Sequence, residues 1–202
     1  MKVLITAGPT REPIDPVRYL SNRSTGVMGC AIAAEAHERG HDVTMVYGPA
    51  ERQPPVGVGI IGVESAREML AAMLDLLEEA DVVICAAAVA DYRPAQVKRT
   101  KIKRGGPLEL SLVENPDIAA EIGKRREHRR LAVFALETES GIENARAKIE
   151  KKNADVCVLN SPDAIGAESG GFALVRSNGE VLEIGHVKKR ELAAALCNEL
   201  GL

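Results

Sequence analysis

The segment KVLITA at residues 2–7 is almost continuously apolar, and the polar segment GPTREPIDPVRYLSNRS at residues 8–24 follows it directly. A short apolar run of this kind is typical of a strand that is buried on both faces of a parallel sheet. The polar connection is too long for an ordinary strand-to-helix turn, and long loops in compact domains are usually functional or disordered. Together the two segments predict a buried first strand whose exit loop is a place to look for chemistry.

The alternation of short apolar runs with helix-like segments continues to the end of the chain. Further strands are predicted at residues 42–47, 58–63, 81–86, 131–136 and 155–160. Helices are predicted at residues 25–39, 66–80, 116–125, 141–152 and 188–200. Near the end, residues 172–176 and 180–184 flank Asn178 and Gly179, which predicts a β-hairpin. The pattern predicts an α/β fold, a Rossmann-like three-layer sandwich with a mostly parallel sheet and a late β-hairpin, in a single domain over residues 1–202.

The composition describes a globular chain of 202 residues, with 46% apolar residues, 27% charged residues and a formal net charge of -3. The apolar content is too high for disorder, and Gly and Pro are too few for a collagen-like chain. No apolar run approaches the roughly 18 residues that a membrane-spanning helix needs, so we expect a cytoplasmic protein. Three Tyr, two Phe and no Trp imply a core of aliphatic side chains. The cysteines lack any CxxC spacing and are expected to be reduced: Cys30, Cys85, Cys157 and Cys197.

The end of the first loop has the features of an anion-binding helix start. Ser24 or Thr25 is the expected N-cap, and Gly26 and Gly29 lie in the expected first turn. Backbone N–H groups at such an end attract phosphate or carboxylate, whereas the alternative is an ordinary cap and a surface loop. The GxGxxG spacing of a dinucleotide site is missing after the first strand, which disfavours nicotinamide binding.

A second unusual loop, residues 86–106, follows the fourth predicted strand and carries Asp91 as its only acid. Six cations follow Asp91 without an intervening acid: Arg93, Lys98, Arg99, Lys101, Lys103 and Arg104. Such a run is a solvated surface, a neutraliser of a triphosphate or a nucleic-acid contact. The negative net charge and the lack of aromatic residues beside the run disfavour nucleic acid. Gly105 and Gly106 fit the hinge of a mobile flap that closes over phosphates.

Three further features have both a structural and a functional interpretation. Asn115 followed by Pro116 is expected to cap a helix. Phe134, near the end of a predicted strand, fits either core packing or a contact with a base. Lys148 and Lys152 share one helix face, which is either an exposed lysine face or part of a site. Hydrolase and zinc-enzyme motifs are missing, and so is the P-loop pattern.

Six motifs occur in an order and at spacings that closely resemble the phosphopantothenoylcysteine synthetase family: AGPTREPIDPVRYLSNRSTG (7–26), AAAVADYRP (86–94), KIKR (101–104), NPDI (115–118), FALET (134–138) and ENARAKIEKK (143–152). The resemblance implies a ligase of coenzyme A biosynthesis that joins 4'-phosphopantothenate to L-cysteine. The carboxylate would attack the α-phosphate of CTP, releasing pyrophosphate and leaving an acyl-cytidylate, from which the amine of cysteine displaces CMP. Mg2+ is the implied cofactor, arriving with CTP, and no residue is assigned to it.

The resemblance also implies roles for individual residues. Asn22 matches the family residue associated with the acyl-cytidylate, and Arg18 matches the arginine that supports its loop. With Lys101, the first residue of KIKR, they are the expected catalytic residues. Asn22 and Ala88 are the expected substrate-binding residues. The implied CTP contacts are Ala88, Asp91, Lys101, Pro116, Asp117, Ile118, Ala119, Phe134, Lys148 and Lys152.

The family is a homodimer whose flap can cross toward the neighbouring site, so the resemblance predicts a homodimer and leaves open whether Lys101 serves its own nucleotide or that of the other subunit. A decarboxylase, fused or separate, is a further implied partner, and no nucleic acid or membrane partner is expected. The chain departs from the family pattern at Val27, where Lys is common, at Arg104 in place of Lys and at Leu136 in place of Ala. Two alternatives stay open: a nicotinamide-dependent oxidoreductase of the same fold and a non-catalytic nucleotide-binding protein.

Overall fold

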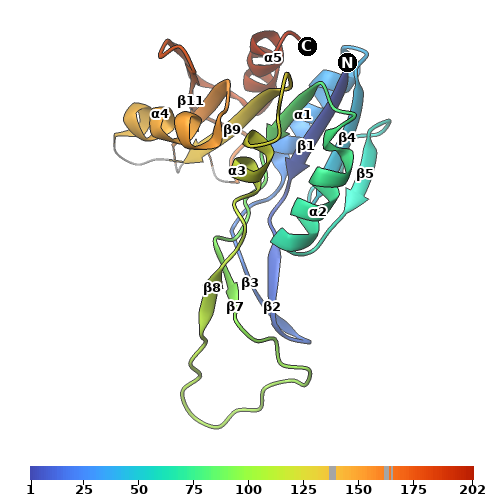
Figure 1. Ribbon diagram of the computed structural model, residues 1–202, viewed down its shortest axis with the longest axis vertical. Coiled ribbons are helices and arrows are strands. Elements are labelled where there is room, and N and C mark those ends of the chain that lie inside the picture. Colours follow the sequence, from blue (N-terminus) through green and yellow to red (C-terminus); the bar gives the residue numbers. More distant parts are fainter. Residues whose placement is uncertain (137–139, 162–163, 165) are drawn as a thin grey trace.

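The computed structural model describes residues 1–136, 140–161, 164 and 166–202, and its centre is an eight-stranded sheet (Figure 1). The strand order is β12-β11-β10-β9-β6-β1-β4-β5. The parallel strands are β1 (Lys2–Ala7), β4 (Asp42–Tyr47), β5 (Gly59–Gly62), β6 (Val82–Cys85), β9 (Arg130–Leu136) and β10 (Val156–Asn160). A late antiparallel hairpin completes the sheet with β11 (Ser169–Arg176) and β12 (Val181–Lys188). The predicted α/β class, the parallel strands and the late hairpin are confirmed.

Helices cover both faces of the sheet and make the predicted three layers. One face packs against α1 (Val27–Glu38) and α5 (Lys189–Glu199), which contact each other. The other face packs against α2 (Ala66–Leu77), α3 (Ile118–Gly123) and α4 (Gly141–Lys152), which contact one another in sequence order. Each face has its own buried cluster, and the largest fully buried side chains are Ile, Leu and Met. The aliphatic core predicted from the composition is therefore confirmed.

The few aromatic residues divide between the core and the surface. Tyr47 and Phe172 are buried in the cluster beside α1 and α5, and Phe134 is half-buried against it. Tyr19 and Tyr92 are 48% and 51% exposed. In the part of the chain that the structure describes, no disulfide joins any two of the four cysteines. Within the described part of the chain, no helix has the length and apolar character needed to cross a membrane.

The start of α1 differs from the prediction, because the helix begins at Val27 and its N-cap is Gly26 rather than Ser24 or Thr25. Gly26 has a φ of 77°, and a Cβ there would lie 2.6 Å from the Tyr47 hydroxyl. A left-handed residue pressed against a neighbouring side chain is a position for glycine. The Ser24 hydroxyl accepts a hydrogen bond from the Gly26 N–H at 3.4 Å, one step outside the helix.

Two segments that the sequence suggested as loops contain short antiparallel strands that form an arm beyond the sheet (Figure 1). We call residues 9–22 and 89–115 the arm. Its first hairpin is β2 (Arg11–Asp15) with β3 (Arg18–Ser21), and its second is β7 (Tyr92–Pro94) with β8 (Leu112–Glu114). Strands β2 and β7 contact each other, and the loop between β7 and β8 lies at the far end of the arm (Figure 1).

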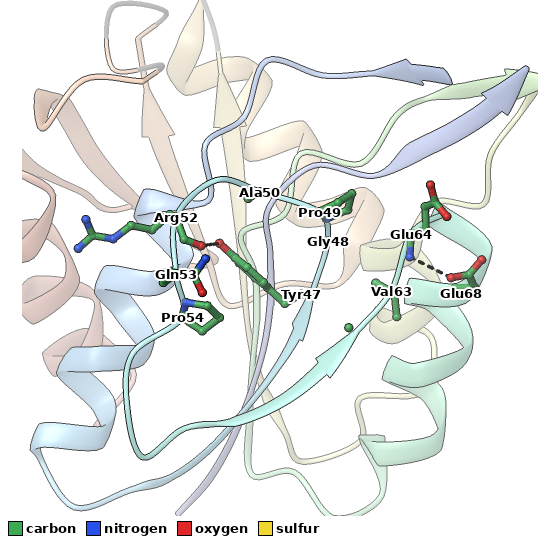
Figure 2. Close-up of a pocket in the computed structure, with 11 residues that line it drawn as sticks. Tyr47, Gly48, Pro49, Ala50, Arg52, Gln53, Pro54, Val63, Glu64 and Glu68 are labelled. Atoms are coloured by element: carbon green, nitrogen blue, oxygen red, sulfur yellow. Dashed lines mark hydrogen bonds between the residues drawn. The ribbon is translucent and has the colours of Figure 1, made fainter. Parts of the chain in front are cut away.

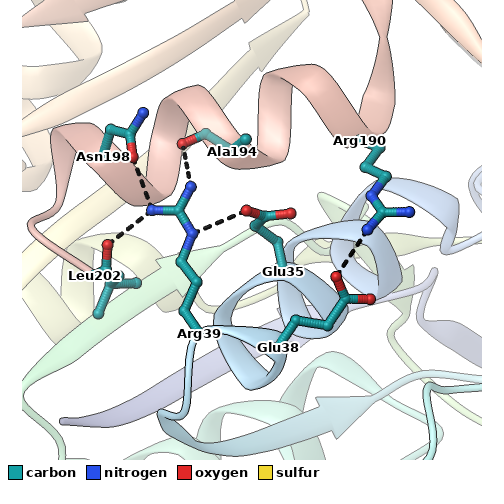
Figure 3. A network of polar contacts seen from close by, with 7 residues as sticks. All are labelled: Glu35, Glu38, Arg39, Arg190, Ala194, Asn198 and Leu202. Carbon is teal, nitrogen blue, oxygen red and sulfur yellow. Dashed lines mark hydrogen bonds and ion pairs between the residues drawn. The ribbon is translucent and has the colours of Figure 1, made fainter.

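A network around Arg39 joins the end of α1 to α5 and to the C-terminal residue (Figure 3). The Arg39 guanidinium donates to Glu35 Oε1 at 2.8 Å on its own helix. It also donates to Asn198 Oδ1 at 2.8 Å, the Leu202 carbonyl at 2.8 Å and the Ala194 carbonyl at 3.2 Å. Because these acceptors belong to two helices and the chain end, Arg39 fixes how α5 sits on α1.

Candidate active site at the junction of sheet and arm

The arm leaves the sheet at the position where ligands bind in open parallel sheets. The chain crosses from β1 through α1 to β4 on one side, and from β5 through α2 back to β6 on the other. The order of the strands therefore reverses between β1 and β6, and the crevice beyond their carboxyl ends is the expected ligand site of such a fold. Both segments of the arm start at these two strand ends.

Hydrogen bonds between the segments that follow β1 and β6 continue to the two points where the arm begins. The Ala88 N–H donates to the Gly8 carbonyl at 2.9 Å, and the Thr10 N–H donates to the Ala88 carbonyl at 3.4 Å. The fully buried Thr10 hydroxyl also accepts the Ala90 N–H at 3.0 Å. The N–H of Ala88, predicted to lie against substrate, is thus committed within the protein, and its carbonyl lies at the junction.

Asn22 sits directly on this junction. Its Nδ2 donates to the Val89 carbonyl at 2.9 Å and to the Ala88 carbonyl at 3.3 Å. The predicted pair Asn22 and Ala88 is therefore in contact. Since two carbonyls use the donor end of the amide, Oδ1, a hydrogen-bond acceptor, is the remaining polar atom of this exposed side chain.

A second group of predicted residues meets at the carboxyl end of β9. Lys148 Nζ donates to the Phe134 carbonyl at 3.1 Å, and Lys152 Nζ lies 3.2 Å from Asp117 Oδ1. The two lysines of α4 thus reach the end of β9 and the start of α3. Lys152 has a carboxylate partner whereas Lys148 rests on a neutral carbonyl, so these three ionisable groups carry a net positive charge. Glu137 and Thr138 of the FALET motif lie outside the described residues.

The NPDI segment caps its helix in a different way from the prediction. Asp117, not Asn115, is the N-cap of α3, and its Oδ1 accepts the Ala120 N–H at 3.1 Å. Asn115 instead donates from Nδ2 to the Ala90 carbonyl at 2.8 Å. This hydrogen bond joins the start of the second arm segment to its end, directly after β8. Pro116 precedes the cap, and Ile118 and Ala119 are buried in the core. Only the backbone of Ile118 and Ala119 is therefore suited to contact a ligand.

Cys85, at the end of β6, is a neighbour of this group that the sequence did not single out. Burial raises the pKa of its thiol to about 12, Lys152 lowers it and Asp117 raises it further. The nearby charges place Cys85 close to the Lys152–Asp117 pair. The apolar sequence of β6 does not predict that Cys85 lies near this ion pair, because its position relative to the pair depends on how α3 and α4 pack against the sheet.

The remaining predicted residues belong to the arm. Asp91 is exposed, and its carbonyl accepts the Asn115 N–H at 2.8 Å. Lys101 is exposed in the loop between β7 and β8, and in the described chain no hydrogen bond or ion pair joins it to the other predicted residues. Arg18 donates to Asp15 Oδ2 at 2.5 Å and to the Ile102 carbonyl at 3.2 Å. Arg18 thus supports the loop that carries Lys101.

A cavity lies at the carboxyl ends of β4 and β5 (Figure 2). It measures about 500 Å³ and includes Arg52, Gln53, Glu64 and Glu68 in its lining. Tyr47 also lines it, and its hydroxyl donates to the Arg52 carbonyl at 2.6 Å (Figure 2). None of the predicted site residues lines this cavity, and those at the ends of β6 and β9 lie on the other side of β1 in the sheet.

Comparison with known proteins gives a family match over residues 1–201, to the model described as DNA/pantothenate metabolism flavoprotein C-terminal domain. The chain is 42% identical over 206 residues to a cysteine/cysteine sulfinic acid decarboxylase from an unknown prokaryotic organism, and the match covers 98% of this chain and 57% of that protein. It is 42% identical over 205 residues to the coenzyme A biosynthesis bifunctional protein CoaBC of Haemophilus influenzae, covering 99% of this chain and 51% of that protein. The chain thus spans about half the length of these curated relatives.

A crystal structure of the C-terminal domain of a coenzyme A biosynthesis bifunctional protein CoaBC superposes on the chain with a TM-score of 0.87. The two are 39% identical, and the match covers 98% of this chain and 93% of that one. The likeness extends over both the sheet and the arm, and it confirms the resemblance drawn from the six motifs. The chain therefore belongs to the family of the C-terminal domain of DNA/pantothenate metabolism flavoproteins.

Proposed function

We propose that the protein is a ligase of coenzyme A biosynthesis that joins 4'-phosphopantothenate to L-cysteine with CTP. The observation that carries the proposal is the convergence of Lys148 and Lys152 on Phe134 and Asp117, beside the crevice between β1 and β6. Cations at the carboxyl edge of a parallel sheet suit the phosphates of a nucleotide. Family membership and the name of the Haemophilus influenzae relative support the same pathway.

The proposed reaction has two steps. In the first, a carboxylate oxygen of 4'-phosphopantothenate attacks the α-phosphorus of CTP, and the bond to pyrophosphate breaks to leave an acyl-cytidylate. In the second, the amine of cysteine attacks the acyl carbon, loses a proton and expels CMP as the amide forms. Positioning and charge stabilisation account for catalysis of this type. Lys148 and Lys152 would offset the charge of the nucleotide, with the ring of Phe134 beside the base.

Asn22 would orient the second step from the junction. Its donor atoms hold the Ala88 and Val89 carbonyls, so in this conformation its Oδ1 is placed to accept a hydrogen bond from the attacking amine. The role implied by the resemblance, in which the amide donates to a developing oxyanion, requires Asn22 to release one of these carbonyls. Asn22→Asp keeps the size of the side chain and an acceptor oxygen but removes the N–H donors. It therefore tests whether Asn22 acts as an acceptor for the amine or as a donor to the oxyanion.

Mg2+ would arrive as part of the CTP complex. In the described part of the chain no group of three or more His, Cys, Asp or Glu side chains is arranged to hold a metal ion. Mg2+ in nucleotide sites is commonly bound through phosphate oxygens and one or two carboxylates, and its charge offsets that of the triphosphate. Asp91 and Asp117 are the two acids among the residues expected to contact CTP.

A homodimer formed through the arm is the proposed assembly. Large apolar side chains are exposed on both hairpins and on the loop between β7 and β8: Val17, Tyr19, Tyr92, Val97, Leu108, Leu110, Leu112 and Val113. Exposed apolar surface on this scale is typical of an interaction site. Because the loop that carries Lys101 lies at the far end of the arm, Lys101 would reach the nucleotide of the partner subunit (Figure 1).

A nucleotide panel tests the function. CTP, ATP, GTP and UTP are each supplied with 4'-phosphopantothenate, with and without cysteine, and pyrophosphate and nucleoside monophosphate are measured. We expect pyrophosphate from CTP that requires 4'-phosphopantothenate, and CMP that additionally requires cysteine. Failure to turn over any of the four nucleotides would contradict the proposal.

Lys148→Met tests the nucleotide position. We expect the KM for CTP to rise about tenfold, because the substitution removes the cation that has no carboxylate partner. Lys151→Met is the matched control, since Lys151 is an exposed lysine on the same helix. An equal effect of both substitutions would place the nucleotide elsewhere.

A further inference from the structure

The hairpin of β2 and β3 contains two buried carboxylates, Glu12 and Asp15, which are 2% and 3% exposed. A buried carboxylate is costly unless donors surround it. Glu12 Oε1 accepts the Ala66 N–H at 3.0 Å, at the start of α2. Asp15 Oδ2 accepts the Ile102 N–H at 3.0 Å, in the loop between β7 and β8. Each carboxylate therefore fixes one distant segment to the hairpin, and the segment on Asp15 is the one that carries Lys101.

Hydrogen bonds engage both carboxylate oxygens of Asp15 and both backbone polar groups of Ile102, its N–H and its carbonyl. Oδ1 accepts the Val17 N–H at 2.9 Å, which holds the carboxylate in place. Oδ2 accepts from Ile102 and from Arg18, and the same Arg18 nitrogen donates to the Ile102 carbonyl at 3.2 Å. Asp15 and Arg18 thus grip the N–H and the carbonyl of one residue, which fixes its orientation as well as its position.

A second contact lies four residues earlier, where the Lys98 N–H donates to the Ile14 carbonyl at 2.9 Å. Beyond Ile102 the described residues 103–110 are exposed and make no hydrogen bond before Ala95 pairs with Ser111. Lys101 therefore stands at the last fixed point before an unsupported loop. Without the hydrogen bonds to Ile102, the loop would be attached only at Lys98 and at Ser111, where the chain returns to β8.

We propose that Asp15 is the positioning residue that sets where Lys101 stands, by holding Ile102 through its carboxylate and through Arg18. The catalytic consequence rests on the proposed function, in which Lys101 contacts the phosphates of CTP. The structural consequence is independent of it: the loop opens when the Asp15 carboxylate is lost. Asp15 does not touch substrate in this proposal.

The test uses Asp15→Asn in the full chain, with Glu12→Gln as the matched control. The introduced amide would keep an acceptor for the Val17 N–H but would turn its NH2 group toward Ile102 and Arg18, which are both donors. Trypsin cleaves after the exposed basic residues of this loop, and cleavage tracks the population of the open form. We expect the initial rate of cleavage after Lys98, Arg99 and Lys101, which precede Ile102, to become about tenfold faster, the effect of losing one charge-assisted hydrogen bond.

Kinetics separate positioning from a general structural role. Asp15→Asn is expected to raise the KM for CTP about tenfold and to leave the KM for cysteine within about twofold, because only CTP meets Lys101. Glu12→Gln is expected to lower the melting temperature while leaving loop cleavage and the KM for CTP unchanged. Loop cleavage that is no faster in Asp15→Asn than in Glu12→Gln would overturn the proposal.

Ile102→Pro provides a second route, because it removes the N–H and leaves Asp15 intact. Trypsin does not cut before proline, so cleavage after Lys98 and Arg99 is compared; it is expected to become faster as in Asp15→Asn, and adding Asp15→Asn should change the rate less than about twofold. Additive effects would show that Asp15 acts elsewhere. If the unmodified protein turns over no nucleotide, the proposed function fails, whereas the cleavage comparison still decides the role of Asp15.

Discussion

Lys152 Nζ lies 3.2 Å from Asp117 Oδ1, the same oxygen that accepts the Ala120 N–H and caps α3. One carboxylate thus begins a helix and holds a cation of the neighbouring helix α4. The ion pair is partly exposed, with side-chain exposures of 18% for Lys152 and 39% for Asp117, so its own contribution to stability is small. The cap is the larger stabilising interaction of the two.

Substitutions at Asp117 separate these two roles. Asp117→Ala is expected to lower the free energy of unfolding by about 1 kcal/mol, the usual effect of losing a side-chain N-cap. Asp117→Asn keeps a capping oxygen and should lower it by less than about 0.5 kcal/mol. Urea denaturation measures both. Equal losses would mean that the charge, rather than the cap, is what stabilises the start of α3.

Subunit mixing tests whether Lys101 acts across a dimer. At CTP concentrations well below KM, Lys101→Gln and Lys148→Met are each expected to keep about a tenth of the original activity. If Lys101 serves the partner subunit, each mixed dimer has one unaltered site, so an equal random mixture should recover about 30% of the original activity. A mixture as inactive as the separate variants would show that Lys101 serves its own subunit.

The reactivity of Cys85 should reflect its raised pKa of about 12. At pH 8 a thiol of this pKa is about one ten-thousandth thiolate, so iodoacetamide should modify Cys85 about three orders of magnitude more slowly than a free thiol. Between pH 8 and pH 10 the rate should rise about tenfold per pH unit. Peptide mass spectrometry measures the rate, and the chain unfolded in urea serves as the control. Modification of the folded protein at the rate of a free thiol would contradict the expected burial.

Gly29→Ala is expected to be strongly destabilising. A Cβ at Gly29 would lie 2.2 Å from the Ala7 Cβ, so α1 would have to move away from β1. Overpacking of this kind costs about 3 kcal/mol. Gly62→Ala is the control, because a Cβ there meets nothing within 4 Å. Thermal denaturation compares the two, and a Gly29→Ala variant as stable as the control would mean that α1 packs less closely.

Arg39→Met should loosen α5 from α1. The substitution leaves the Asn198, Leu202 and Ala194 acceptors of the Arg39 network without their donor (Figure 3). We expect a loss of about 2 kcal/mol, which lowers the melting temperature by about 4–8 °C in a domain of this size. Arg190→Met is the control, since the Arg190–Glu38 pair is largely exposed. Equal effects of the two substitutions would contradict the role of Arg39.

The sheet could be predicted from the sequence because its signal is local. The segment at residues 2–7 is apolar enough to be buried on both faces, and its pairing with β4 and β6 follows from the alternation of strands and helices. Residues 141–152 form α4 with the bounds expected from their pattern. The Ser65 cap of α2, which accepts the Glu68 N–H at 3.3 Å, follows equally from a local motif.

The arm could not be predicted in the same way, because contacts between distant segments define it. Strand β7 is only three residues long and has no detectable period, whereas β8 ends the alternating segment LELSLVE (108–114), whose strand-like pattern does not say which segment it pairs with. Asn115 and Asp117 are both capping residue types, and only the position of Ala90 decides that Asn115 bonds elsewhere. Asp15 looks like a surface acid beside a proline until Ile102 is placed against it.

The contacts that hold the two segments of the arm can form only in a fixed order while the chain is being synthesised. The edge of β1 that pairs with β6 stays open until residue 85 has left the ribosome, and the grip on Ile102 needs about 20 residues more. Until then the nascent chain exposes an unpaired strand edge and holds Asp15 without its distant donor. Residues 2–22 therefore complete their contacts only after segments that are synthesised later have joined them.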